Sequence, residues 1–260
     1  MVKGKTVLVT GSTSGIGKGI AEAFAMEGAN IVLNGFGDPQ EIEQLKEDLR
    51  SRHGMSVGYE DADLMDSTAI EEMMRRIEAD FGGVDILVNN AGIQHVDSLE
   101  DFPPEKWDAV ISLNLSSVFH TTRLALPSMR SQGWGRIINI ASAHGLVASE
   151  KKSAYVAAKH GVMGLTKVTA LETANSGITC NAICPGWVLT PLVQKQVDAI
   201  AEKQGVDQEE AKKILLSEKM PHHQFVTVEQ LGATALYLCS PAADTMTGVP
   251  VTLDGGWTAR

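Results

Sequence analysis

The stretch Thr6-Val7-Leu8-Val9-Thr10-Gly11-Ser12-Thr13-Ser14-Gly15-Ile16-Gly17 joins a short apolar run to a glycine-rich turn. Residues 6–10 have the composition of a buried β-strand, and a helical pattern follows the turn to about Gly28. Glycines at a strand-to-helix turn let the backbone approach a pyrophosphate, which then lies at the helix N-terminus. The spacing G-x-x-x-G-x-G differs from the common G-x-G-x-x-G, so the turn alone is a weak indication of dinucleotide binding.

The rest of the chain repeats the same alternation of strand and helix. Further strands are expected at residues 30–34, 56–60, 84–88, 136–141, 178–184 and 250–253. Long helices are expected between them, one of them unbroken over about residues 105–130. This order predicts a doubly wound, Rossmann-type α/β fold, a seven-stranded parallel sheet with helices on both faces. No linker or repeat interrupts it, so residues 1–260 are expected to form one domain, with a polar helical insertion over about 190–220 as a lid.

Composition excludes several classes of partner. The chain has 260 residues with a formal net charge of −10, which disfavours nucleic acid and anionic membranes. No apolar run approaches the roughly 18 residues of a membrane span, and the strand beginning near Thr6 leaves no room for a signal peptide. Three cysteines, Cys180, Cys184 and Cys239, fit buried thiols in a reducing cytoplasm. The seven histidines show no metal-ligand spacing apart from the pair His222-His223, so no metal site is predicted.

A second stretch contains the residues for acid–base chemistry. Ser142 follows a strand, and the run from Lys152 to Lys159 begins a helix on which Lys152, Tyr155 and Lys159 share a face. A tyrosine in water keeps its proton up to a pH of about 10. A neighbouring ammonium lowers that pKa, whereas burial raises it. The group fits an acid–base centre for a carbonyl/alcohol pair; the alternative is an ordinary amphipathic helix with one half-buried tyrosine and two solvated lysines.

The end of the second strand bears on the choice of dinucleotide. Gly35-Phe36-Gly37 offers neither an acidic residue for the adenosine ribose nor a basic one for a 2′-phosphate. We therefore expect NAD, although Lys18 beyond the glycine turn would be a possible phosphate partner. Asp63 fits either an adenine contact or a cap of the helix that starts near Ser67.

Six motifs together resemble the short-chain dehydrogenase/reductase family over nearly the whole chain. They are T10-G11-x-x-x-G15-x-G17, N89-N90-A91-G92, Asn114, Ser142, Y155-x-x-x-K159 and P185-G186. The resemblance implies a nicotinamide cofactor and a homotetramer. It makes Tyr155 the acid/base, Ser142 the holder of the substrate oxygen and Lys159 the group that lowers the Tyr155 pKa and binds the nicotinamide ribose. It places Asn114 in a proton relay; the alternative is a tolerated polar residue at a helix interface. The cofactor contacts it implies are Gly11, Thr13, Ser14, Gly15, Ile16, Gly17, Phe36, Asp63, Leu64, Asn90, Ala91, Gly92, Tyr155, Lys159, Pro185, Gly186, Val188 and Thr190.

The chain is similar, more narrowly, to the subfamily of bacterial D-3-hydroxybutyrate dehydrogenases. The similar stretches are residues 34–37, 90–95, 140–149 and 254–260, while Leu189 and Pro221-His222-His223 depart from the subfamily pattern. The resemblance implies a substrate carboxylate held by Gln94, His144, Lys152 and Gln196, with Trp257 nearby. Lys152 at a helix N-terminus opposes the helix dipole, which independently favours an anion beside it. The expected reaction is NAD-dependent oxidation of (R)-3-hydroxybutyrate to acetoacetate. The alternatives are an NADPH-dependent 3-oxoacyl thioester reductase and, more remotely, a non-catalytic dinucleotide sensor.

Overall fold

A computed structural model describes residues 2–259, and within them the predicted parallel sheet is confirmed. Its seven strands have the order β3-β2-β1-β4-β5-β6-β7, and every neighbouring pair is parallel. The strands are β1 Thr6–Val9, β2 Asn30–Asn34, β3 Val57–Glu60, β4 Ile86–Asn89, β5 Gly135–Ile140, β6 Ile178–Pro185 and β7 Pro250–Leu253.

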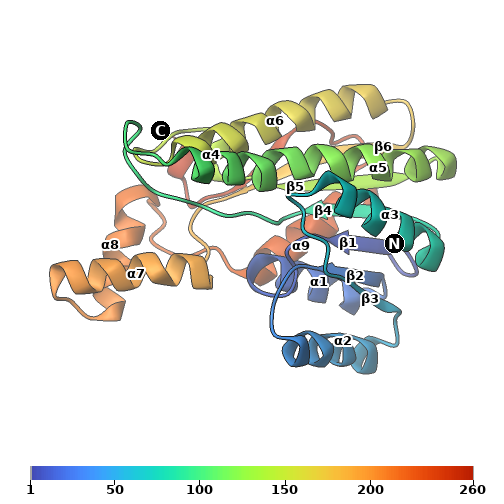
Figure 1. The fold of residues 1–260 in the computed structure, drawn as a ribbon, viewed down its shortest axis with the longest axis horizontal. Helices are drawn as coiled ribbons and strands as arrows, with labels where there is room; N and C mark the ends of the chain where they lie inside the picture. The colour runs from blue at the N-terminus through green and yellow to red at the C-terminus, as the bar shows by residue number, and fades with distance from the viewer. Residues whose placement is uncertain (1, 260) are drawn as a thin grey trace.

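Helices cover both faces of the sheet, as the apolar character of the central strands requires. In β1, Val7 and Val9 join a core cluster with α1, α2 and α9, while Leu8 between them joins a cluster with α3, α5 and α6. This is the alternation of side chains expected for a strand buried on both faces. Figure 1 shows α4, α5 and α6 on one side of the sheet and α1, α2 and α9 on the other. The helices are α1 Gly15–Met26, α2 Pro39–His53, α3 Ser67–Phe81, α4 Pro104–Ile111, α5 Ser117–Gln132, α6 Ser153–Thr173, α7 Pro191–Gln204, α8 Gln208–Lys219 and α9 Val228–Leu238.

The order of the strands places a binding crevice between β1 and β4. The chain runs outward from β1 to β3 and then returns to the other side of β1 with β4. Connections on either side of this point leave the sheet in opposite directions, and ligands of doubly wound sheets bind there, at the carboxyl ends of the strands. Helices α7 and α8 extend away from the sheet at one side of Figure 1, where residues 190–220 were expected to form a separate helical insertion.

The helix predicted over about residues 105–130 is broken in the structure. Helix α4 ends at Ile111, a π-helical turn spans Ser112–Ser116, and α5 continues to Gln132. A π turn inserts one extra residue without changing the apolar periodicity enough to be recognised from the sequence, and such turns occur often at functional sites. Asn114 lies in this turn and is fully buried.

None of the helices within residues 2–259 has the length and apolar character of a membrane-spanning segment.

Buried amides tie the middle strands to the helices that cover them. Asn89 on β4 donates from Nδ2 to Asn139 Oδ1 on β5 at 2.9 Å, and Asn139 Nδ2 donates to Thr166 Oγ1 on α6 at 2.8 Å. All three side chains are almost completely buried. Replacing Asn139 would therefore leave polar partners without hydrogen bonds inside the core.

We expect Asn139→Ala to lower the free energy of unfolding by about 1–3 kcal/mol, since at least one buried polar partner loses its bond. The thermal midpoint of unfolding, compared with wild type, measures this loss. The exposed amide variant Gln132→Ala is the control and should stay within about 0.5 kcal/mol of wild type. An Asn139 variant as stable as the control would show that the buried bonds contribute nothing net.

Candidate active site

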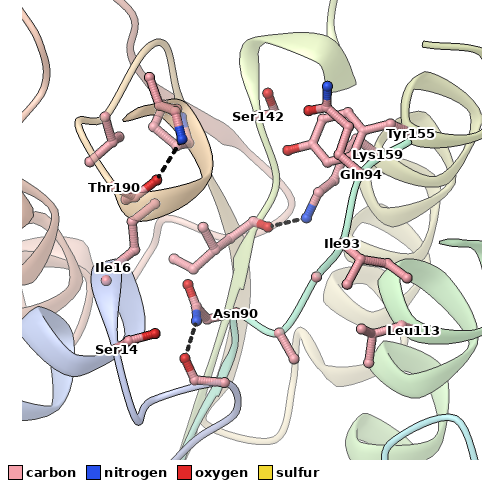
Figure 2. Close-up of a pocket in the computed structure, with 18 of the residues that line it drawn as sticks. Ser14, Ile16, Asn90, Ile93, Gln94, Leu113, Ser142, Tyr155, Lys159 and Thr190 are labelled. Carbon is pink, nitrogen blue, oxygen red and sulfur yellow. Dashed lines mark hydrogen bonds between the residues drawn. The ribbon is translucent and has the colours of Figure 1, made fainter. Parts of the chain in front are cut away.

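One cavity of about 600 Å³ lies along the carboxyl ends of the central strands. The loops after β1, β4, β5 and β6 line it, together with the start of α6, the start of α7 and Trp257 near the C-terminus. In Figure 2, Ser142, Tyr155, Lys159 and Gln94 lie together on one side of the cavity, and Ser14, Ile16 and Thr190 lie on the opposite side. Residues far apart in the sequence thus meet as the strand order requires.

Ser142 and Tyr155 lie together in the cavity, and the serine hydroxyl acts on the phenol. The backbone N–H of His144 donates to Ser142 Oγ at 3.1 Å, which leaves the serine O–H free to donate elsewhere. A hydrogen bond from Ser142 acts on Tyr155 and lowers its pKa. Both side chains line the cavity, so an oxygen of a ligand at this point meets two hydroxyl groups.

Lys159 is buried beneath the tyrosine. Its Nζ donates to the Ile140 carbonyl at the end of β5 at 2.7 Å and lies 5.6 Å from the centroid of the Tyr155 ring. Burial lowers the pKa of Lys159 to about 8. The carbonyl bond fixes the ammonium at the floor of the cavity, next to the phenol.

The pKa of Tyr155 is raised, which corrects the expectation that the neighbouring lysine lowers it. Burial is the larger cause of the upward shift, and the hydrogen bond from Ser142 opposes it only in part. The sequence predicted that burial raises this pKa and that the lysine lowers it, but not which prevails, because that depends on how deeply the hydroxyl is buried. The ligand-free site therefore holds a protonated phenol at neutral pH.

Asn114 is placed outside the cavity lining. Its Oδ1 accepts from the Ile93 N–H and its Nδ2 donates to the Ile93 carbonyl, both at 2.9 Å. The amide thus holds the loop that carries Gln94 through one of its N–H groups and its oxygen. The proton-relay role implied by the family resemblance stays a prediction.

The predicted carboxylate-binding residues line the same cavity, and two of them lie beside Tyr155 (Figure 2). Gln94, His144, Lys152, Gln196 and Trp257 all line it. His144 packs edge to face against Tyr155 and Trp257, with ring centroids 5.9 and 4.9 Å apart. Burial, together with the charge of Lys152, lowers the pKa of His144 to about 4, so its ring is neutral at pH 7.

Trp187 is a cavity residue that the sequence reading missed. It follows the Pro185-Gly186 turn directly, and that position at the end of β6 is the signal that would have identified it. The Lys152 ammonium lies 4.9 Å from the centroid of the Trp187 ring, a cation–π contact. Burial lowers the pKa of Lys152 to about 8.

Ten further residues line the cavity although the sequence did not predict them. They are Asn34, Gly35, Ala62, Met65, Ile93, Leu113, Ile140, Ala141, Pro191 and Val193.

The glycine turn after β1 has the close packing that a dinucleotide site needs. Gly11 has φ of +61°, and a Cβ there would lie 2.9 Å from Ala91 Cα. Gly17 is buried outside the cavity lining, and a Cβ there would collide with the Gly11 carbonyl and with Asn90 Nδ2. Asn90 Nδ2 donates to the carbonyls of Thr10 and Gly11 at 2.9 and 3.0 Å. Gly17 therefore shapes the turn, and Asn90 braces it.

The N-terminus of α1 is open to an anion. Ser14 caps the helix without a side-chain hydrogen bond, and the first turn contains no acidic residue. The free N–H groups and the helix dipole favour a phosphate group at this end. Apart from Gly17, the remaining predicted cofactor residues all line the cavity, including Phe36, Asp63, Leu64, Val188 and Thr190. The residues present thus fit a dinucleotide.

The segment 190–220 contributes Gln196 from α7. Thr190 caps α7 by accepting from the Val193 N–H at 3.4 Å, and α7 packs against α8. Of the positions that depart from the subfamily pattern, Leu189 is 42% exposed outside the cavity lining. His222 donates its backbone N–H to the Gly255 carbonyl at 3.0 Å, which ties the end of this segment to the turn before Trp257.

The sequence of the chain is similar to those of known dehydrogenases. The profile of the family described as short chain dehydrogenase matches residues 5–201. A D-beta-hydroxybutyrate dehydrogenase of Cupriavidus necator is 62% identical over the full length of both chains. The enzyme of that name from Rhizobium meliloti is 54% identical, over 98% of this chain and 99% of its own.

Two solved structures that contain NADPH share the fold. L-sorbose reductase from Gluconobacter frateurii, complexed with NADPH and L-sorbose, has a TM-score of 0.94 at 30% identity, covering 100% of this chain and 98% of that one. A variant of the actinorhodin polyketide ketoreductase with NADPH has a TM-score of 0.91 at 32% identity, covering 100% of each chain. The chain is an oxidoreductase that uses a nicotinamide dinucleotide, and it belongs to the short-chain dehydrogenase family.

Proposed function

We propose that the protein catalyses the reversible, NAD-dependent oxidation of (R)-3-hydroxybutyrate to acetoacetate. The observation that carries this proposal is a buried ammonium at one end of the cavity. Lys152 is only 9% exposed, and His144, Gln94 and Gln196 line the same cavity as Tyr155. A buried cation among polar side chains suits a small anion. The names of the C. necator and R. meliloti relatives support the same substrate.

One set of residues orients the substrate, and another set transfers the proton. Lys152 and its neighbours hold the carboxylate, so that the C3 hydroxyl reaches Ser142 and Tyr155. Ser142 donates to that oxygen, and Tyr155 takes the hydroxyl proton in oxidation and returns it in reduction. Lys159, held beside the phenol by the Ile140 carbonyl, would bind the ribose of the nicotinamide. The bound nicotinamide supplies the hydride acceptor.

The preference for NAD is part of the proposal. Phe36, at the end of β2, is 65% exposed and offers a 2′-phosphate no charge. Asp38, two residues further on, has a carboxylate that accepts the N–H groups of Gln40 and Glu41 at the start of α2. Lys18 lies outside the cavity lining and 4.0 Å from Glu22. Neither Phe36 nor Lys18 therefore presents a positive charge to a 2′-phosphate in the cavity lining.

The proposal also covers the oligomeric state of the enzyme, its location in the cell and the closing of a lid over the substrate. The large apolar side chains of Phe119, Val168 and Leu171 on α5 and α6 are exposed, which favours a homotetramer in which other subunits cover them. We place the enzyme in the cytoplasm, where its three buried free thiols stay reduced. The chain acts as one domain in which residues 190–220 close over the substrate.

Initial rates with both enantiomers of 3-hydroxybutyrate, each with NAD⁺ and NADP⁺, test the proposal. We expect turnover of the (R)-enantiomer with NAD⁺ and little with NADP⁺ or the (S)-enantiomer. The reverse assay adds acetoacetate with NADH and an acetoacetyl thioester with NADPH. Turnover confined to the thioester and NADPH would replace the proposal with the thioester reductase, and binding without any turnover would indicate a sensor.

A further inference from the structure

Ser149 lies next to His144, one of the residues predicted to hold the substrate carboxylate. Its Oγ lies 2.9 Å from Nε2 of His144. Ser149 is partly buried in the loop between Ala143–Gly145 and α6, and it is not part of the cavity lining. The hydrogen bond therefore acts on the substrate site only through the imidazole ring.

The loop that carries Ser149 is fixed at its far end. Lys151 has φ of +62°, a conformation that non-glycine residues adopt rarely. Its carbonyl accepts from the Asp97 N–H at 3.0 Å, which ties the loop to the segment that follows Gln94. Lys152 comes next and caps α6. The Ser149 hydroxyl is thus held in a defined place beside the ring.

A neutral imidazole carries its proton on one nitrogen only. Burial keeps the His144 ring neutral, and the charges of Lys152 and Lys219 act in the same direction. Among residues 2–259, Nε2 has the Ser149 hydroxyl as its partner and Nδ1 has no hydrogen bond. A carboxylate only accepts hydrogen bonds, so Nδ1 can hold it only when Nδ1 carries the proton. In that tautomer Nε2 is an acceptor, and Ser149 must be the donor.

We propose that Ser149 is a positioning residue, whose hydroxyl donates to Nε2 of His144 and thereby keeps the ring proton on Nδ1, available to the substrate carboxylate. The inference rests on the proposed function, because it takes the ligand to be a carboxylate. It extends the carboxylate-binding set to a residue that never touches the substrate. A serine here has a chemical task, since an alanine would leave the two tautomers to compete.

Ser149→Ala and Ser149→Thr separate this task from a structural one. In Ser149→Ala we expect KM for (R)-3-hydroxybutyrate to rise about 3- to 10-fold, the range that one hydrogen bond supports, with kcat and the KM for NAD⁺ close to wild type. Ser149→Thr keeps the hydroxyl and should keep the wild-type KM. An equal loss in both variants, or none in Ser149→Ala, would overturn the proposal.

Nitrogen-15 NMR of histidine-labelled protein reads the tautomer directly. The His144 signals are assigned by their loss in His144→Gln, and spectra are taken without ligand and with NAD⁺ and acetoacetate. We expect a protonated Nδ1 in wild type and Ser149→Thr, and a mixture in Ser149→Ala. A wild-type ring protonated at Nε2 would refute the proposal even if every variant folded poorly. Failure of wild type to oxidise (R)-3-hydroxybutyrate would instead refute the proposed function, and the ligand-free spectrum would still report the tautomer.

Discussion

Replacing Tyr155 with phenylalanine should lower kcat for oxidation of (R)-3-hydroxybutyrate by about 10²- to 10⁴-fold, the usual contribution of a positioned acid–base group. The ring that lines the cavity and packs against His144 remains in the variant, and only the hydroxyl is lost. Ser142 keeps its bond from the His144 N–H, so the rest of the site should hold its shape. The dinucleotide should still bind, because the α1 N-terminus and Lys159 are unchanged. Steady-state rates and titration with NADH measure the two effects separately.

The control for this variant is Tyr237→Phe. Tyr237 lies on α9 and is 46% exposed, and within residues 2–259 its hydroxyl donates only to Met246 Sδ, at 3.5 Å. The same chemical change should therefore leave kcat unaltered there. If Tyr155→Phe kept most of its activity, another group would have to accept the substrate proton, and the acid–base assignment would be lost.

The fold was predictable because its signals are local and repeated. The central strands β1, β4, β5 and β6 are buried along their whole length, and the turns after β1, β2, β4, β6 and β7 contain glycine or asparagine. The order of elements then fixes which ends meet. Ser142, Tyr155 and Lys159 come together for that reason, since β5 and α6 are consecutive and lie beside the crevice.

Other features depend on distances that no sequence pattern encodes. The π turn around Asn114 disrupts a helix without changing its composition. The sign of the Tyr155 pKa shift depends on how far burial outweighs the bond from Ser142. Trp187 stands at a strand end, where cavity residues are expected, but an aromatic side chain also suits the core, and only the structure shows Lys152 above its ring.

Replacing Lys152 with alanine should lower kcat/KM for 3-hydroxybutyrate by about 10- to 150-fold, through loss of charge-assisted hydrogen bonds of about 1.5–3 kcal/mol. The effect should fall on KM, because Lys152 holds the end of the substrate remote from C3. Lys151→Ala is the matched control: it removes the neighbouring exposed charge and keeps the backbone bond to Asp97. Equal activity of Lys152→Ala and wild type would mean that the carboxylate binds elsewhere.

The pH dependence of KM distinguishes the charge of Lys152 from its bulk. Burial lowers the Lys152 pKa to about 8, partly offset by Glu218 and reinforced by Lys219. A lowered pKa means that the ammonium is charged below pH 8 and loses its proton above it, and a neutral amine holds a carboxylate poorly. In wild type, KM for 3-hydroxybutyrate should therefore rise as the pH is raised through about 8. Bound carboxylate favours the charged form, so the midpoint seen at saturating substrate should lie higher than that of the free enzyme. In Lys152→Ala this rise should disappear, whereas a merely space-filling role for Lys152 would leave the profile unchanged.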